Sequence, residues 1–143
     1  MKLSNGLMVK QMMEAYQQKI PHLPVPLDGE TAELRKKLIT EEYHEVMDAI
    51  NNNEPLRDLA KELCDLLVVT YGTLLALGVN PDYAFTLVHN SNMTKLGSDG
   101  RPVKNEYGKV VKSENYKPAD MNKIYDATTS GIAYYNVVSP CVQ

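Results

Sequence analysis

Hydrophobic residues recur at helical spacing over most of the chain, and proline, glycine and asparagine residues interrupt this pattern. Pro21, Pro24 and Pro26 exclude helix from the first interruption. Gly78 fits the end of one helix, and Pro81 fits the first turn of the next. The pattern therefore predicts four helices, which span approximately residues 7–19, 28–51, 55–77 and 80–95.

The pattern changes after the fourth helix. A turn cluster at residues 97–100 precedes the segment 103–112, in which two short runs flank Gly108 and favour a β-hairpin. One more helical turn is expected after Pro118, whereas the segment from Ser130 has no clear period and could pack on a partner subunit or be loose. We therefore expect an all-α domain over residues 1–120, a four- to five-helix bundle with a short C-terminal β-hairpin, and an extension over residues 121–143.

Acidic residues of the second predicted helix lie on its apolar face. On a helical wheel that starts at Leu34, Leu38 falls at about 40°. Glu45, Glu42 and Glu41 fall at about 20°, 80° and 340° on the same wheel. Three carboxylates therefore share the stripe that carries the leucines.

The third predicted helix repeats this arrangement. With Asp58 at 0°, Glu62 falls at about 40°, Asp65 at about 340° and Val69 at about 20°. Beyond Asp65 this helix is apolar nearly all round, which predicts a central, buried helix. We therefore expect Asp65 to be shielded from bulk water.

Two helices thus direct five acids toward one interior strip. Single acidic pairs on helices are usually solvated, but two pairs on apolar stripes argue against that interpretation. Unpaired burial of like charges costs several kcal/mol per ion, so the acids need cations. Lys36 points away from the strip, whereas Lys37 and Lys61 reach only its edge, so a divalent metal is the better account. Ligands that are all oxygen favour Mg²⁺, Mn²⁺ or Ca²⁺ over zinc; the five acids are Glu41, Glu42, Glu45, Glu62 and Asp65.

Composition narrows the classes of function. The 143 residues carry a net charge of −3, which argues against a dedicated duplex-DNA binder. Two cysteines exclude a disulfide scaffold and a cysteine-rich zinc site. The longest apolar run, residues 63–77, contains Asp65 and is shorter than the roughly 20 residues of a membrane span. No signal peptide is recognised, so we expect a soluble, cytoplasmic protein with no nucleic-acid or membrane partner.

The acids spell Glu41-Glu42-x-x-Glu45, followed by Glu62-x-x-Asp65. This pattern resembles the signature of the all-α nucleoside triphosphate pyrophosphohydrolases, which include MazG, dimeric dUTPases and phosphoribosyl-ATP pyrophosphohydrolase. The resemblance covers about residues 7–120; further stretches similar to MazG-like and phosphoribosyl-ATP pyrophosphohydrolase-like members are residues 34–42, 65–78, 91–96, 108–110 and 115–118.

The resemblance implies a helical bundle that forms a homodimer, or a dimer of dimers, around shared active sites. It implies Mg²⁺-dependent hydrolysis of a nucleoside triphosphate to the monophosphate and pyrophosphate, with Mn²⁺ as a possible substitute. Glu41 then becomes the candidate general base that orients the attacking water, and the metal ligands are Glu42, Glu45, Glu62 and Asp65.

Polar residues beyond the third helix supply candidates for substrate binding. Asn92 and Lys95 are three positions apart and share one helix face, where Lys95 can neutralise a phosphate. Tyr116 could stack on a base or pack under a loop. Like Tyr116, three further residues could extend the phosphate or base site: Lys109, Lys112 and Asn115.

Two other functions fit parts of the pattern. A di-iron carboxylate bundle would need two Glu-x-x-His motifs, and only Glu41-x-x-His44 has that spacing. A non-catalytic helical module could bind a nucleotide or a protein and hold a structural cation with the same acids. Cys64 is expected in the core rather than as a nucleophile, and His44 on the surface. The sequence leaves the preferred base and sugar open.

Overall fold

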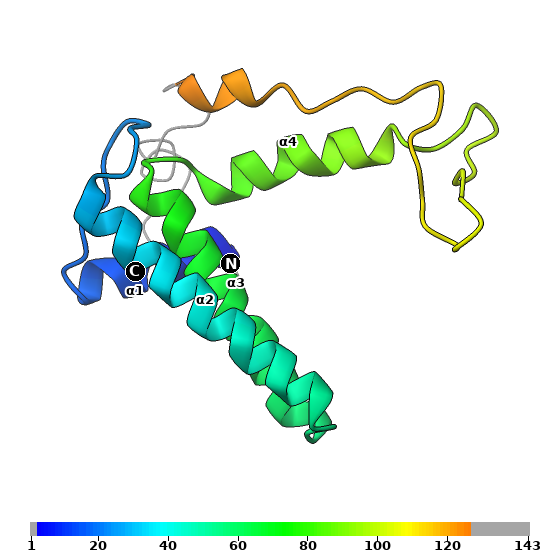
Figure 1. The fold of residues 1–143 in the computed structure, drawn as a ribbon. Helices are drawn as coiled ribbons and strands as arrows, with labels where there is room; N and C mark the ends of the chain where they lie inside the picture. Colours follow the sequence, from blue (N-terminus) through cyan, green and yellow to red (C-terminus); the bar gives the residue numbers. More distant parts are fainter. Residues whose placement is uncertain (1–2, 127–143) are drawn as a thin grey trace.

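Four α-helices and one 3₁₀-helix make up the regular structure of the computed structural model, which describes residues 3–126. Figure 1 shows that α2 and α3 form a long antiparallel hairpin, and that α1 and α4 lie at its open end. The expected all-α class is confirmed; the elements are α1 (Asn5–Ala15), α2 (Gly29–Asn51), α3 (Leu56–Ala76), α4 (Pro81–Met93) and η1 (Met121–Tyr125).

Side-chain caps explain where the helices begin. The Asp28 carboxylate accepts a hydrogen bond of 2.7 Å from the Thr31 backbone N–H at the start of α2. The Asn80 side chain does the same for Tyr83 at the start of α4, over 3.1 Å. The first helix ends at Ala15 and not near residue 19 as expected, because Gln17 adopts a left-handed conformation with φ of 58°.

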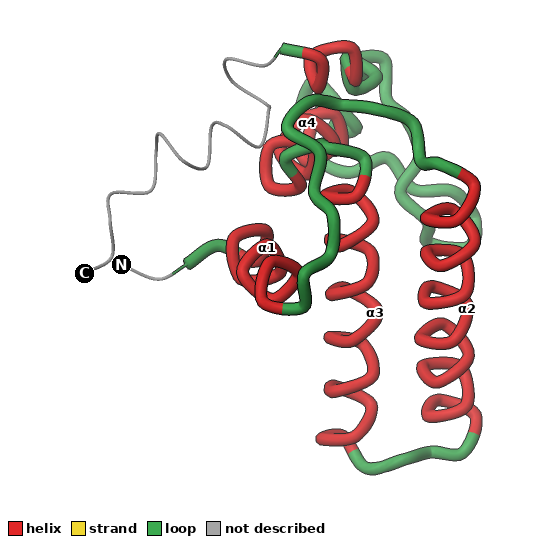
Figure 2. Tube along the Cα trace, turned by 90° about the vertical axis from the view of Figure 1, so that its left-hand side faces the viewer, coloured by secondary structure: helices red, strands yellow, loops and turns green. Residues whose placement is uncertain are grey.

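The core lies where α1 crosses the second half of α3 (Figure 2). Val9, Met13 and Leu75 form its buried centre, and Val68 and Tyr71 pack against it. Asp82 in α4 fastens α1 to this end, since it accepts hydrogen bonds from the Ser4 hydroxyl at 2.6 Å and the Gly6 N–H at 3.2 Å. The helices at the open end of the hairpin are therefore held by both apolar burial and polar contacts.

The proline-rich connection between α1 and α2 crosses the end of α3. Val25 donates a backbone hydrogen bond of 2.9 Å to Leu77. Gly78 has a φ of +70°, and a Cβ at this position would lie 2.2 Å from the Leu23 carbonyl oxygen. Only glycine fits here, because both the backbone conformation and the close approach exclude a side chain.

The first half of α3 is not buried, contrary to expectation. Leu56 and Leu63 are 84% and 45% exposed, and Cys64 is exposed rather than part of the core. In this chain α2 covers one face of that half, and α1 crosses α3 only farther along (Figure 2). The apolar stripe of α3 is therefore longer than the core that one chain provides.

The β-hairpin expected over residues 103–112 is also wrong, since the described residues contain isolated bridges but no strands. The bridge between Lys104 and Val110 surrounds a tight turn at Gly108, whose φ is 76°. All residues from 101 to 110 are exposed. The turn forms because glycine tolerates this conformation, but the flanking runs have no apolar surface on which to extend into a sheet.

The expected helical turn after Pro118 is present as η1, which contacts α4. The irregular segment expected from Ser130 lies outside the described residues. Within the described part of the chain, no helix is both long enough and apolar enough to cross a membrane.

Candidate active site and metal centre

The α2–α3 hairpin brings acidic side chains from two helices together. Glu42 of α2 and Glu62 and Asp65 of α3 each offer a carboxylate oxygen, and these three oxygens lie within 4.8 Å of one another. All three residues are half-buried. Three of the four ligands predicted from the sequence therefore converge on one point, which we call the acidic cluster.

One oxygen of the acidic cluster has no partner among the described residues. Glu42 Oε2 is buried and accepts no hydrogen bond. A buried carboxylate oxygen without a donor is unfavourable by roughly 1–3 kcal/mol or more. A hard divalent cation, which prefers carboxylate oxygens, fits this donor set. The orphaned oxygen is therefore a structural observation that favours metal binding by the acidic cluster.

Glu45, the fourth predicted ligand, meets the acidic cluster through Glu62. A hydrogen bond between the two side chains raises the pKa of Glu45, and repulsion from Glu42 raises it further. Two carboxyl groups can share a hydrogen bond only when one carries a proton. The pKa shift of Glu45 therefore reports the crowding of negative charge that a cation would relieve.

Lys61 already neutralises part of this charge. Its Nζ lies 2.8 Å from Asp65 Oδ2 and 3.3 Å from Glu62 Oε1, and these contacts raise the pKa of Lys61. The wheel position of Lys61 predicts that it reaches only the edge of the strip, but its side chain extends inward from that edge. The four-residue spacing to Asp65 is the signal that would have indicated the pair.

Glu41, the predicted general base, lies on α2 and is exposed. It does not belong to the acidic cluster. Its carboxylate is therefore accessible to water, whereas its neighbour Glu42 turns toward α3.

The predicted substrate-binding residues gather in a second region, at the end of α4 and in the segment that follows it. Asn92 is exposed near the end of α4, and Lys95 lies in the next turn, where its N–H donates to the Asn92 carbonyl at 3.1 Å. The Lys112 ammonium lies 4.6 Å from the centre of the Tyr116 ring. One face of this ring therefore already carries a cation.

Hydrogen bonds fold this second region onto itself. Ser113 donates to the carbonyl groups of Thr94 and Leu96 at 3.2 and 2.8 Å. The Asn115 amide donates to the Ser98 hydroxyl at 3.4 Å, and Lys109 is exposed beside the turn at Gly108. The segment is thus ordered by its own polar groups.

The structure does not bring the two regions together within one chain. Figure 1 shows α4 diverging from the α2–α3 hairpin, with the following segment at its far end. Among the described residues, no hydrogen bond or salt bridge joins the acidic residues of α2 and α3 to the second region. A site that included both predicted groups of residues would therefore need either a conformational change or a second chain.

Arg35 is a buried polar residue whose burial is not evident from the sequence pattern. It lies on α2, is only 5% exposed, and its Nε has no hydrogen-bond partner among the described residues. Its polar contact is with the neutral Gln18 side chain at 3.4 Å, and burial lowers the pKa of its guanidinium. Seven positions separate Arg35 from Glu42, which places it about 10 Å along the same helix. The spacing of apolar residues along the sequence does not reveal that an arginine is buried.

Comparison with known protein families shows to which family the chain belongs. A family model described as phosphoribosyl-ATP pyrophosphohydrolase matches residues 9–92, which is more than half of the chain. The chain belongs to this family. The phosphoribosyl-ATP pyrophosphohydrolase family is part of the MazG-like all-α NTP pyrophosphohydrolase superfamily, so the resemblance seen in the sequence is confirmed. No curated protein matches the chain.

Membership of the phosphoribosyl-ATP pyrophosphohydrolase family supports a pyrophosphohydrolase that acts on a nucleotide triphosphate. The matched range contains α2, α3 and therefore all five predicted acids. It ends at Asn92, so the other predicted substrate-binding residues fall outside it.

Proposed function

We propose that this protein is a Mg²⁺-dependent pyrophosphohydrolase that cleaves an NTP or dNTP to the monophosphate and pyrophosphate, in cleaning or adjusting a cytoplasmic nucleotide pool. The observation that carries the proposal is the acidic cluster with its unpartnered Glu42 oxygen, inside the range that matches the family. Mn²⁺ has similar ligand preferences and is expected to substitute. The proposed partners are the nucleotide and a second copy of this chain, without nucleic acid or membrane.

In this proposal the acids hold the cation, and the ligands are Glu42, Glu45, Glu62 and Asp65. A divalent ion supplies neutralisation of the triphosphate charge and a more acidic bound water. Without the ion, the Lys61 ammonium reduces the repulsion between the Glu62 and Asp65 carboxylates. When an ion is bound, Lys61 can turn outward, because its side chain is 64% exposed.

Glu41 is the proposed general base. Its exposed carboxylate stands one residue from Glu42, so it can accept a proton from a water beside the ligands. Phosphoryl transfer depends mainly on positioning and charge stabilisation, so Glu41 has only to orient that water for attack on phosphorus.

The second region is proposed to bind the phosphate chain and the base. Asn92 supplies an amide for a sugar or phosphate oxygen, and Lys95 supplies a positive charge. Tyr116 offers its remaining ring face for stacking. Asn115 and the positive charges of Lys109 and Lys112 extend this surface.

A homodimer, or a dimer of dimers, is proposed to complete the site. Two observations support this assembly: the second region lies away from the acidic cluster of its own chain, and leucines in the first half of α3 remain exposed. Packing these leucines against a second copy would bury them and could bring the second region of one chain toward the acids of the other.

The deciding experiment is an assay of pyrophosphate and phosphate release from a panel of NTPs, dNTPs and phosphoribosyl-ATP. Each substrate is tested with Mg²⁺, with Mn²⁺ and with EDTA. Pyrophosphate release that EDTA abolishes is the expected result, and the panel then gives the base preference. If only phosphoribosyl-ATP is cleaved, the reaction class holds and the proposed substrate class is wrong.

A binding protein would behave differently in the same samples. A triphosphate with Mg²⁺ would raise the melting temperature without any release of pyrophosphate, because a ligand stabilises the folded state that binds it. That outcome would contradict the proposed hydrolysis.

A further inference from the structure

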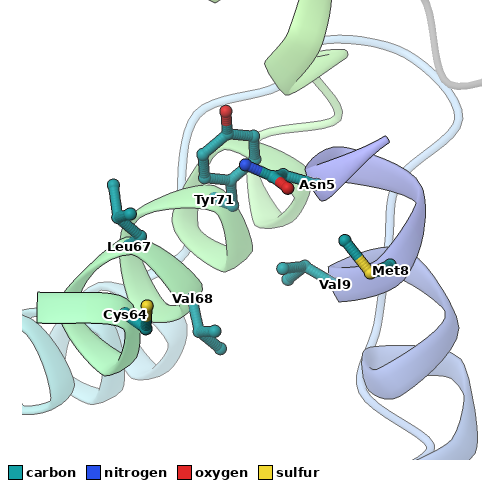
Figure 3. A pocket seen from close by; sticks show the side chains of 7 residues that line it. All are labelled: Asn5, Met8, Val9, Cys64, Leu67, Val68 and Tyr71. Carbon is teal, nitrogen blue, oxygen red and sulfur yellow. The ribbon is translucent and has the colours of Figure 1, made fainter. Parts of the chain in front are cut away.

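An apolar groove lies between α1 and α3, on the side of α3 that α2 leaves open (Figure 3). Its volume is about 210 Å³. Met8 and Val9 line it from α1, and Leu67, Val68 and Tyr71 line it from α3. Met8 is 44% exposed and Leu67 is 51% exposed. Apolar surface of this kind is stabilised when it is covered.

The chemistry of the groove favours an uncharged apolar occupant. Its other lining residues are Asn5 and Cys64, so no charged side chain lines it. A charged segment would lose hydration there without gaining a counter-ion. The occupant should therefore be an apolar stretch with few polar groups.

The described chain ends against α4, the helix that packs on the start of α1. After the second region, Ser91 of α4 binds the Lys117 carbonyl through its hydroxyl at 2.7 Å, and η1 then contacts α4. Figure 1 shows η1 over the first half of α4. The first turn of α4 contacts the start of α1 through Asp82, and the groove begins there at Asn5. The described chain thus ends on α4, the helix that contacts one wall of the groove.

The composition of residues 127–143 matches the groove. This segment contains no Asp, Glu, Lys, Arg or His. Its apolar residues include Ile132, Tyr134, Tyr135, Val137 and Val138. It therefore has the chemistry that the lining residues favour.

The same segment is long enough to reach the groove. An extended chain spans at most about 3.3–3.6 Å per residue, so residues 127–143 can cover up to roughly 60 Å. Passing over α4 and α1 requires about 20–25 Å, since each helix with its side chains is roughly 10–12 Å wide.

We propose that the segment 127–143 of this chain docks in the α1–α3 groove, with the apolar run at residues 132–138 covering Met8, Leu67 and their neighbours. The proposal does not depend on the reaction that the acidic cluster performs. Its failure and the failure of the proposed function are therefore separate results.

The two cysteines of the chain provide a direct test. Cys64 lines the groove and Cys141 lies within the docking segment. Mild oxidation of the full chain should form a Cys64–Cys141 disulfide within one molecule, detected by intact mass and by mobility on a non-reducing gel. The rate is measured at several protein concentrations, because an intramolecular rate does not depend on concentration.

A matched control moves the thiol along the same helix. In a chain with Cys64→Ser and Leu56→Cys, the new thiol is on α3, exposed, and outside the groove. Rates are normalised to alkylation of each thiol by iodoacetamide. Docking predicts disulfide formation at least about tenfold faster for Cys64, since docking raises the effective concentration of the two thiols.

A second variant tests the apolar contact itself. Val137→Asp with Val138→Asp, in the full chain, should lower the Cys64 rate to that of the Leu56→Cys control. Equal normalised rates at the two positions would overturn the proposal. So would a disulfide that forms mainly between molecules, because a second copy would then be the occupant of the groove.

Discussion

The two ends of the α2–α3 hairpin differ in what covers them. At the open end, α1, α4 and the proline-rich connection pack on α3, and Leu75 and Met13 are fully buried. At the closed end, α2 and α3 pack mainly on each other, and Leu56 and Leu63 are 84% and 45% exposed. The acidic cluster lies toward the closed end. Stability and candidate chemistry are thus concentrated in opposite halves of one hairpin.

The largest expected effect concerns activity at the closed end. Glu62→Gln or Asp65→Asn should lower Mg²⁺-dependent pyrophosphate release by at least about 100-fold, because metal ligands contribute several kcal/mol of charge stabilisation. The melting temperature without metal should fall little or rise, since a crowded charge is removed. Turnover and melting temperature are measured on the same samples.

Glu54→Gln is the matched control for these variants. Glu54 is an exposed acid in the turn between α2 and α3, outside the acidic cluster. Its activity should stay within about twofold of the parent, because isolated surface substitutions have small effects. Full activity in both Glu62→Gln and Asp65→Asn would contradict the site.

The next largest effect concerns packing, and it compares the two ends directly. Leu75→Ala should lower the free energy of unfolding by about 2–5 kcal/mol, as expected for a fully buried leucine. Leu63→Ala should cost less than about 1 kcal/mol in a dilute monomer, because that side chain is already 45% exposed. Urea unfolding at several protein concentrations measures both.

A concentration-dependent cost for Leu63→Ala would sharpen the comparison. It would mean that a second copy covers the closed end and that the hairpin has a core on both ends only in the oligomer. A large cost that does not depend on concentration would contradict the exposed position of Leu63.

A smaller effect is expected at Gly72, where α3 passes closest to Arg35. A Cβ at Gly72 would lie 2.8 Å from Arg35 Nη1 and 3.5 Å from Met13 Sδ. Alanine inside a helix is favoured over glycine by roughly 0.5–1 kcal/mol, and the displacement of the Arg35 guanidinium works against this gain. Gly72→Ala should therefore lower the free energy of unfolding by about 0–2 kcal/mol. Gly29→Ala is the control, since no atom lies within 4 Å of its added Cβ. Equal melting temperatures for the two variants would refute the tight contact.

The smallest expected effects concern pH, and they have opposite signs at the two ends. Hydrogen bonds from Thr31 lower the pKa of Asp28, so its stabilising contribution is present above the usual pKa of 3.8 and is lost as the pH falls through the lowered value. Asp28→Asn should keep the cap but lose this acid dependence.

Glu45 is the counterpart at the closed end. Because its pKa is raised, its contribution is present below the usual pKa of 4.5 and is lost as the pH rises through the raised value. Thermal unfolding between pH 2 and 7 in EDTA, compared with Asp28→Asn and Glu45→Gln, checks both signs. A steeper acid loss in Asp28→Asn than in the parent would contradict the cap.

The helices and the convergence of Glu42, Glu62 and Asp65 could be predicted from the sequence because each depends on local spacing. Caps such as Asp28 and the wheel positions of Glu42, Glu62 and Asp65 are properties of one helix at a time. The exposed half of α3 did not follow, because periodicity shows which face is apolar and not what covers it. Arg35 also escaped notice, since its burial depends on where α1 crosses α3. Lys61 was discounted because a wheel gives a direction and ignores the reach of a flexible side chain.

The hydrogen bonds of Asp82 have a consequence for the order of assembly. The residues that they join are separated by 76 and 78 positions in the sequence. In contrast, α2 and α3 are connected by a turn of a few residues. Closing a long loop costs more entropy than closing a short one. The α2–α3 hairpin can therefore form from local contacts before α1 packs against α4. We therefore expect the contact between α1 and α4 to be the last of these helix contacts to form during folding.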